Sequence, residues 1–203
     1  MSRPTVHVID DDDSFLLSAT RLFRASGFQV KAFTSAGDFL ERLPGDARGC
    51  VVSDLQMPGM SGLELQEAMK REGYVLPVVF LTGMGDIPST VTAMRHGAVD
   101  FLEKDAPKER LIDAVNRALA RDAAEQDLLR HRQEMRDRLS KLSDREREVM
   151  SHVVRGLMNK EIAAELGIHE RTVKLHRTAI TSKLGLQSVA ELTRLWLEAT
   201  DEV

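Results

Sequence analysis

Short apolar runs alternate with longer helical patterns over the first 120 residues of the chain. The apolar runs end at Ile9, Phe33, Ser53, Leu81 and Glu103, and segments with helical spacing separate them. This alternation predicts an α/β unit in which helices cover both faces of a parallel sheet. The runs lack a strict apolar-polar alternation, as expected for strands that are buried on both faces.

Turn and capping residues mark where the helices of this part begin. The predicted starting points are Asp13 or Ser14, Ser35, Ser61, Pro88 and Pro107. Serine and aspartate accept hydrogen bonds from the free N–H groups of a first helical turn, and proline suits the first helical position. We therefore expect helices at about 13–25, after Ser35, after Ser61, at 88–97 and at 107–120.

The rest of the chain carries helical signals. Residues 121–140 contain interleaved charges and neither Pro nor Gly, so they are predicted to extend the preceding helix as a connector. Their apolar positions are too sparse to predict a coiled coil. Residues 141–203 are predicted to form four helices that begin near Ser143, Asn159, His169 and Ser188. The expected parts are thus 1–120, 121–140 and 141–203.

Charge and composition narrow the possibilities further. Residues 1–110 hold the whole net charge of −4, whereas 171–183 contain four basic residues and no acidic one. A basic helix on a neutral module is compatible with nucleic-acid binding. The chain lacks a long apolar run and an apolar leader, so we expect a cytoplasmic protein without a membrane partner. Cys50 is the single cysteine, which excludes an intramolecular disulfide, and its apolar strand favours a buried packing role.

Groups that phosphoryl chemistry uses follow four of the five apolar runs. They are Asp10 and Asp11, Asp54, Thr82 and Lys104. The carboxyl ends of parallel strands meet at one edge of a sheet, so these groups are expected to converge. Carboxylates, with the backbone carbonyl of Gln56, suit Mg²⁺ or Mn²⁺. Asp54 would then be the nucleophile that forms an aspartyl phosphate, while the hydroxyl and the ammonium bind phosphoryl oxygens. Each of these residues taken alone is more often a plain cap or turn residue, so the prediction rests on their joint pattern.

The same residues stand in a pattern that resembles the receiver domain of bacterial two-component response regulators. The matching segments are Val-Ile-Asp10-Asp11-Asp12, Asp54-Leu-Gln-Met-Pro-Gly-Met-Ser-Gly-Leu-Glu, Leu-Thr82-Gly and Phe101-Leu-Glu-Lys104. The resemblance covers residues 5–120. It implies a flavodoxin-like, doubly wound five-stranded parallel sheet with strand order 2-1-3-4-5.

The resemblance also implies a role for each residue. A sensor histidine kinase would phosphorylate Asp54, Asp10 and Asp11 would hold Mg²⁺, and Thr82 and Phe101 would form the switch. Such a domain promotes its own phosphotransfer and dephosphorylation without being a stand-alone enzyme. From the residues alone, Phe101 is a strand aromatic, which is more often a core residue than a switch, so its switch role rests on the resemblance.

The chain departs from the receiver pattern after Lys104. Receivers usually place proline directly after this lysine, whereas Asp105 and Ala106 follow it here and proline comes at Pro107. Because a non-proline cis bond costs about 3–4 kcal/mol, the bond after Lys104 is expected to be trans. Asp105 could also pair with Lys104 and compete with phosphate. The resemblance also implies that Gln56 and Met84 flank the phosphoryl group. An amide and a thioether are not obvious bases, so we expect slow self-dephosphorylation.

The third part carries a helix-turn-helix pattern. Ala163 stands four residues before Gly167, which suits two helices that meet at a close approach. Leu142-Ser-Asp-Arg145-Glu-Arg-Glu148-Val, Asn-Lys-Glu-Ile-Ala and Arg-Thr172-Val-Lys174-Leu-His176-Arg177 resemble the LuxR-type module of the NarL/FixJ subfamily. The predicted DNA-contacting residues are Arg171, Thr172, Lys174, Leu175, His176, Arg177, Thr178 and Thr181. Apolar residues of the last helix, Val189, Leu192, Leu195 and Trp196, could form core or a dimer contact.

Together these patterns predict a response regulator whose phosphorylation at Asp54 drives homodimerisation and sequence-specific binding to double-stranded DNA. Transcription would be regulated through that binding, with RNA polymerase as a further partner. Two alternatives stay open from the residues. One is a Mg²⁺-dependent phosphohydrolase, and the other is a DNA-binding protein with a degenerate receiver that acts without phosphorylation.

Overall fold

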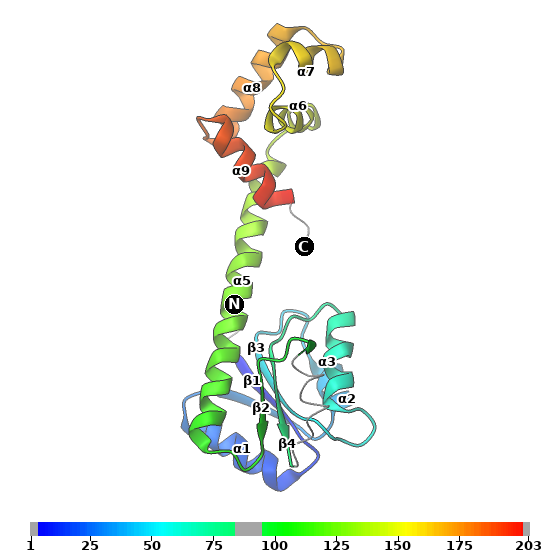
Figure 1. Ribbon diagram of the computed structural model, residues 1–203, viewed down its shortest axis with the longest axis vertical. Coiled ribbons are helices and arrows are strands. Elements are labelled where there is room, and N and C mark those ends of the chain that lie inside the picture. The colour runs from blue at the N-terminus through cyan, green and yellow to red at the C-terminus, as the bar shows by residue number, and fades with distance from the viewer. Residues whose placement is uncertain (1–3, 84–94, 201–203) are drawn as a thin grey trace. The chain divides into compact units, whose positions relative to one another are not determined.

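The computed structural model describes residues 4–83 and 95–200, which divide into two compact units between Glu125 and Gln126. The strands of the first unit are β1 (Thr5–Ile9), β2 (Gln29–Phe33), β3 (Gly49–Asp54), β4 (Val78–Thr82) and β5 (Asp100–Glu103). Its helices are α1 (Asp13–Ala25), α2 (Ala36–Arg42), α3 (Gly62–Arg71) and the first part of α5 (Lys108–Ser140) (Figure 1).

The strands form one parallel sheet in the order β2-β1-β3-β4-β5. This confirms the predicted fold class and strand order. Ile9 of β1 lies opposite Ser53 of β3, and Asp54 lies opposite Leu81 of β4. The residues that follow β1 therefore reach the same sheet edge as the ends of β3 and β4.

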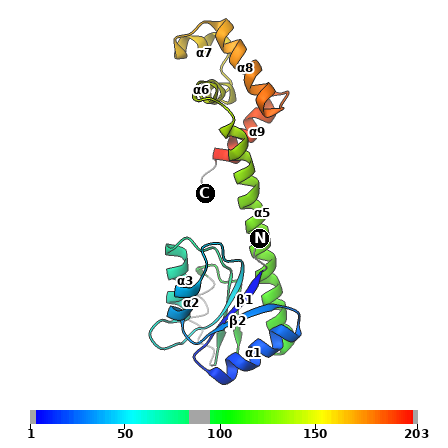
Figure 2. The same cartoon turned by 180° about the vertical axis from the view of Figure 1, so that it is seen from behind.

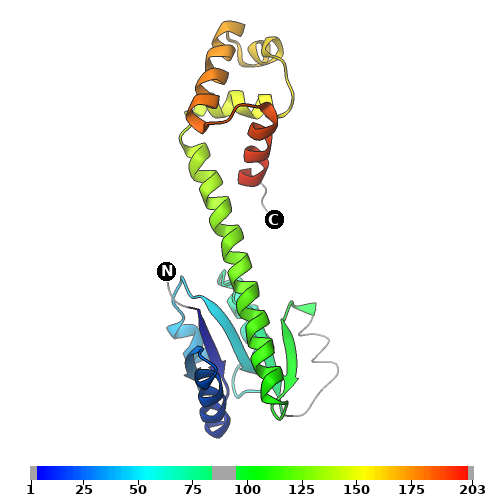
Figure 3. The ribbon, with the colours of Figure 1, turned by 90° about the vertical axis from the view of Figure 1, so that its left-hand side faces the viewer.

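Helices cover both faces of the sheet, and each face has its own hydrophobic core. Apolar residues of α1 and α5 pack on one face, with Phe23, Val52 and Ala118 among its buried members. Figure 3 shows this face, crossed by α1 and the first part of α5. Helices α2 and α3 lie on the other face (Figure 2), where Phe39 and Phe80 are fully buried. Cys50 is 0 % exposed and belongs to the first of these cores, as predicted.

The cap of α1 lies one residue earlier than predicted. Asp12, rather than Asp13 or Ser14, is the N-cap, because its extended backbone lets its carboxylate accept hydrogen bonds from the N–H groups of Ser14 and Phe15. The predicted caps at Ser35 and Ser61 are confirmed. Most of the helix expected at 88–97 lies outside the described residues, and so does Met84.

A buried ion pair holds α5 to the amino end of β3. Asp122 is 1 % exposed, and its carboxylate accepts hydrogen bonds from the Arg48 guanidinium and from the backbone N–H of Gly49 at 3.2 Å. The compact first unit consequently extends beyond residue 120, where the sequence pattern placed its end.

The second unit is helical. It contains the end of α5, α6 (Asp144–Val154), α7 (Asn159–Leu166), α8 (Glu170–Leu184) and α9 (Val189–Thr200). Ser143 and Ser188 cap their helices as predicted. Asn159 does not cap α7. Met158 occupies that position and its N–H donates to Glu161, whereas the Asn159 side chain accepts a hydrogen bond from the Arg177 guanidinium at 3.0 Å.

Candidate functional site

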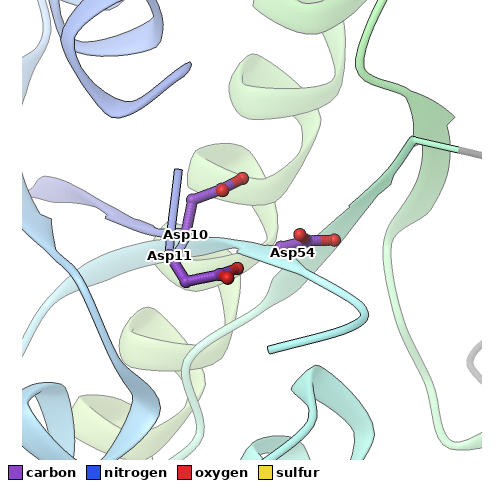
Figure 4. A group of neighbouring side chains, drawn as sticks. All are labelled: Asp10, Asp11 and Asp54. Carbon is purple, nitrogen blue, oxygen red and sulfur yellow. The ribbon is translucent and has the colours of Figure 1, made fainter. Parts of the chain in front are cut away.

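Three carboxylates meet at the carboxyl edge of the sheet. Asp10 and Asp11 follow β1, and Asp54 ends β3 (Figure 4). Oxygen atoms of the three side chains lie within 4.8 Å of one another. The Asp10 side chain is 1 % exposed and that of Asp54 is 10 % exposed, whereas Asp11 is exposed. The edge thus combines a buried, a nearly buried and an open carboxylate.

Lys104 bridges two of these carboxylates. Its ammonium nitrogen Nζ lies 2.6 Å from Oδ2 of Asp10 and 2.9 Å from Oδ2 of Asp54. The same nitrogen stands 4.8 Å from the centroid of the Phe15 ring. Burial by itself would lower the pKa of Lys104, but hydrogen bonds and charge from the two aspartates outweigh burial and raise it. Lys104 is therefore a charged group aimed at the acidic cluster.

The residues after Lys104 do not disturb this arrangement. The Lys104–Asp105 peptide bond is trans, as expected, and Asp105 is exposed. In the described part of the chain, Lys104 forms ion pairs with Asp10 and Asp54 and none with Asp105. The Lys104 backbone N–H donates to the carbonyl of Thr82 at 2.8 Å and so continues the β4–β5 pairing. This bond holds Lys104 at the sheet edge where the carboxylates lie.

The environment of Asp10 favours a hard cation. Burial raises the pKa of Asp10, although the Lys104 ammonium and the N–H of Asp12 counteract part of that rise. Among the described residues, the ammonium of Lys104 pairs with two of the three carboxylates, so negative charge is left over at the edge. An all-oxygen donor set with excess negative charge suits Mg²⁺ or Mn²⁺. The acidic cluster fits the kind of metal that the sequence predicts.

The other predicted site residues lie around the same edge. Thr82 ends β4 and is 3 % exposed. Phe101 lies opposite Phe80 in the β4–β5 pairing and is half-buried against the core on the α2 and α3 face. Gln56 is exposed, and its N–H donates to Oδ1 of Asp54 at 3.3 Å. A buried threonine and a loop N–H thus lie at the edge of the sheet where Asp54 stands, whereas the Phe101 ring packs against the core on the α2 and α3 face.

The second unit presents a polar helix face. Val173, Ile180 and Leu184 of α8 are buried, whereas Arg171 and Lys174 are exposed. The remaining predicted DNA-contacting residues also lie on α8: Thr172, Leu175, His176, Arg177, Thr178 and Thr181. Leu175 is 65 % exposed, an unusual position for an aliphatic side chain. The structure places all eight predicted residues on one helix, with Arg171, Lys174 and Leu175 exposed, whereas Arg177 is half-buried and donates to the Asn159 side chain.

An open groove between the start of α7 and α8 adds residues that the sequence reasoning missed. Lys174, Arg177, Thr178 and Thr181 line it together with Met158, Asn159, Lys160 and Glu170, and it encloses about 650 Å³. Lys160 could have been predicted from the sequence, because it is a basic residue in the first turn of α7, the helix before α8. Met158, 67 % exposed, gave no polar signal.

Family profiles match both units. The profile of the response regulator receiver domain matches residues 6–116, and that of bacterial regulatory proteins of the luxR family matches residues 140–196. Among residues 4–83 and 95–200, none of the helices has the length and apolar character needed to cross a bilayer.

Similar proteins share this domain order along nearly the whole chain. Nodulation protein W of Bradyrhizobium diazoefficiens is 42 % identical over 96 % of this chain and 86 % of its own length. The transcriptional regulatory protein FixJ of Azorhizobium caulinodans is 44 % identical over 96 % and 92 %. The solved structure of the response regulator StyR is 43 % identical, covers 96 % of this chain and 98 % of its own, and has a TM-score of 0.82. This chain therefore belongs to the FixJ-type two-component response regulators, transcription regulators that join a receiver domain to a LuxR-type DNA-binding domain.

Proposed function

We propose that Asp54 accepts a phosphoryl group from the phosphohistidine of a sensor kinase. One carboxylate oxygen of Asp54 would form a bond to phosphorus while the phosphorus–nitrogen bond breaks, and the imidazole leaves with a proton. The observation that carries this proposal is the convergence of three carboxylates with the ammonium of Lys104 at one sheet edge. Asp54 is the candidate acceptor because Asp10 is almost enclosed and Asp11 lies open to water.

Asp10, Asp11 and Asp54, with the backbone carbonyl of Gln56, would hold Mg²⁺. The metal supplies positive charge that offsets the repulsion between the carboxylates and the incoming phosphoryl group. Lys104 would exchange its carboxylate partners for a phosphoryl oxygen, and Thr82 would hydrogen-bond another. Phe101 would move with Thr82. These changes form the switch that biases the receiver toward homodimerisation.

DNA binding is proposed for the outward face of α8. Arg171 and Lys174 would contact phosphates or base edges, and the exposed Leu175 would contact a thymine methyl group. Thr172, His176, Arg177, Thr178 and Thr181 would complete the contact surface. Dimerisation would place two such modules on two half-sites and so raise affinity through effective concentration. RNA polymerase would be the partner of the bound dimer.

The phosphorylation step is tested by Asp54→Asn, with Asp13→Asn as a matched control. Asp13 is an exposed carboxylate in the first turn of α1, outside the acidic cluster. After incubation with acetyl phosphate and Mg²⁺, mass spectrometry should find one phosphoryl group on the wild type and on Asp13→Asn, and none on Asp54→Asn. Sedimentation should show phosphate-dependent dimers for the first two proteins. Equal dimerisation and DNA binding by Asp54→Asn would overturn the proposal.

Lys104→Met tests the switch separately from the acceptor. Lys108→Met is its control, because the Lys108 side chain is 71 % exposed. Lys104→Met should still take up a phosphoryl group from acetyl phosphate, at a lower level, but should dimerise much less per phosphorylated molecule. Dimerisation per phosphoryl group equal to that of Lys108→Met would exclude a role of Lys104 in the switch.

The DNA-binding face is tested by Lys174→Ala against Lys141→Ala, which removes an exposed lysine outside α8. Loss of one phosphate contact in each module should reduce the salt dependence of DNA affinity, with a change of about 1.8 in the slope of log K against log salt for the dimer. A base contact would instead change the preferred sequence in a binding-site selection. The face is wrongly assigned if Lys174→Ala matches Lys141→Ala in affinity, slope and sequence preference.

A further inference from the structure

An aromatic ring lies beside the ammonium of Lys104. Nζ of Lys104 stands over the ring of Phe15, 4.8 Å from the ring centroid, and the same nitrogen contacts Oδ2 of Asp10 and Oδ2 of Asp54. The Lys104 side chain is only 20 % exposed, so this cation is largely withdrawn from water. A cation over the face of an aromatic ring is attracted to it, and the attraction is stronger where water is excluded. Phe15 is therefore a further partner of this ammonium, one that carries no charge.

The first turn of α1 fixes the position of Phe15. Oδ1 of Asp10 accepts a hydrogen bond from the N–H of Asp12 at 2.9 Å, and Oδ1 of Asp12 accepts one from the N–H of Phe15 at 3.3 Å. The Phe15 side chain is half-buried and packs against the core on the α1 and α5 face. Helix α1 thus begins directly after the acidic cluster, and its capping bonds hold the ring at the same sheet edge.

The backbone around Lys104 leaves the place of its ammonium open. Lys104 follows β5 in a turn, which a hydrogen bond of 3.0 Å from the Ala106 N–H to the Glu103 carbonyl closes. The ammonium stands at the end of a flexible stem, and holding such a side chain in one conformation costs conformational entropy. Contacts of the side chain itself must therefore hold the ammonium at the acidic cluster.

The ring differs from the two carboxylates in one respect that matters for phosphorylation. In the proposed function, on which this inference rests, Asp10 and Asp54 would bind Mg²⁺ and Asp54 would accept the phosphoryl group, so both ion pairs of Lys104 would weaken. A phenyl ring takes part in neither event and keeps its face toward the ammonium. We propose that Phe15 is a positioning residue, which holds Lys104 at the acidic cluster while a phosphoryl oxygen replaces its carboxylate partners.

NMR of the protein without metal or phosphoryl donor tests the contact. Protons over an aromatic ring are shifted upfield, so in protein labelled with ¹³C-lysine the ε-CH₂ signal of Lys104 should lie upfield of the other lysine signals. Lys104→Met identifies this signal by its loss. Phe15→Leu should return it to the range of the other lysines, whereas Phe15→Tyr, which keeps the ring, should leave it shifted. An unshifted Lys104 signal in the wild type would overturn the proposal.

The rate of phosphorylation by acetyl phosphate with Mg²⁺ tests the positioning role. Phe15→Leu keeps an apolar side chain but loses the ring, so its rate should fall about fivefold, as for the loss of one cation–π contact. Phe15→Tyr should keep a rate close to that of the wild type. Phe28→Leu is the matched control, because Phe28 is half-buried against the same core and its ring lies 6.3 Å from that of Phe23. Circular dichroism of each variant checks that the fold is kept.

Loss of the ring should matter only while Lys104 is present. Phe15→Leu should hardly change the rate in a Lys104→Met background, whereas a residue that only packs the core would lower it equally in both backgrounds. The positioning role is overturned if Phe15→Leu is phosphorylated as fast as the wild type, if its loss is as large without Lys104, or if Phe15→Tyr or Phe28→Leu loses as much. A wild type that takes up no phosphoryl group would overturn the proposed function, and the NMR signal alone then decides whether Phe15 holds Lys104.

Discussion

His7 is a buried imidazole in the middle of β1. It is 3 % exposed, it contacts the rings of Phe33 and Phe39, and neither ring nitrogen has a hydrogen-bond partner in the described part of the chain. Burial, with a smaller contribution from the charge of Lys31 on the neighbouring strand, lowers the pKa of His7 to about 4. The folded receiver therefore requires a neutral His7.

The lowered pKa predicts a loss of stability in acid. The unfolded chain binds a proton at His7 below about pH 6.5, whereas the folded chain binds it only near pH 4. The part of the unfolding free energy that depends on a neutral His7 is therefore fully present above pH 6.5 and is lost as the pH falls toward 4. The loss amounts to about 2 kcal/mol at pH 5 and about 3 kcal/mol below pH 4. Urea unfolding of the wild type and of His7→Leu across this range measures it. Parallel pH profiles for the two proteins would contradict the prediction.

At the scale of elements, one glycine decides how closely α3 approaches the acceptor strand. A Cβ atom added to Gly62 would lie 2.4 Å from the backbone oxygen of Asp54 and 3.0 Å from the Phe80 ring. The Gly62 N–H also donates to the Leu55 carbonyl at 3.0 Å. The start of α3 is thus packed directly against the end of β3, where Asp54 stands.

Gly62→Ala should consequently destabilise the receiver by about 1–3 kcal/mol, because the helix and the strand must separate. Gly37→Ala is the matched control. Gly37 lies in α2, an added Cβ meets nothing within 4 Å, and the change should stabilise by roughly 0.5–1 kcal/mol. Urea unfolding measures both variants, and phosphorylation by acetyl phosphate should be impaired in Gly62→Ala. Equal stability of the two variants would show that the approach is not tight.

The ion pair of Arg48 and Asp122 links two other elements, β3 and α5. Removing one partner leaves the other buried without compensation, and the Asp122 side chain is the more enclosed, 2 % exposed against 19 % for Arg48. Arg48→Ala should cost about 3–5 kcal/mol of unfolding free energy, and Asp122→Ala less. Arg48→Met combined with Asp122→Leu should recover most of the loss. Chemical denaturation should find Arg48→Ala less stable than Asp122→Ala and the double variant close to the wild type. The opposite ranking of the two single variants would refute the prediction.

The whole molecule contains two separate sets of cores joined by one helix. Buried apolar residues of α5 belong to the receiver core as far as Ala118 and to the DNA-binding core from Met135 onward. Between Glu125 and Met135, a stretch that the structure describes in full, α5 buries no hydrophobic side chain, and Leu128 and Leu129 are 50 % and 47 % exposed. Each domain therefore has its own source of stability.

Two thermal transitions are expected from this organisation. Mg²⁺ at ten times its dissociation constant should stabilise the receiver by about 1.4 kcal/mol, which raises its transition by about 3–6 °C and leaves the other unchanged. Asp10→Asn should abolish the shift, whereas Asp13→Asn should keep it. Scanning calorimetry with Mg²⁺ or with a chelator measures the effect. A single transition that moves as a whole would contradict the independence of the domains.

Local patterns in the sequence are enough to predict the parallel sheet, the helices on both of its faces that the structure describes, and the residues of the acidic cluster. These follow from local regularities: apolar runs of strand length, capping residues and the polar residue at each strand end. Asp10, Asp54 and Thr82 could be placed together because parallel strands put their carboxyl ends at one edge. The resemblance to receivers and to LuxR-type modules, carried by contiguous motifs, added the expected order of the strands and the recognition helix.

Tertiary structure decided what depends on residues far apart in the chain. The aim of Lys104 at Asp10 and Asp54, the pairing of Arg48 with Asp122 and the replacement of Asn159 by Met158 as a cap position all arise from packing between elements. Spacing along the chain records periodicity and chemistry within an element. Which side chains form hydrogen bonds or ion pairs with one another is decided only when the elements pack, because burial and competition for partners are properties of the assembled fold.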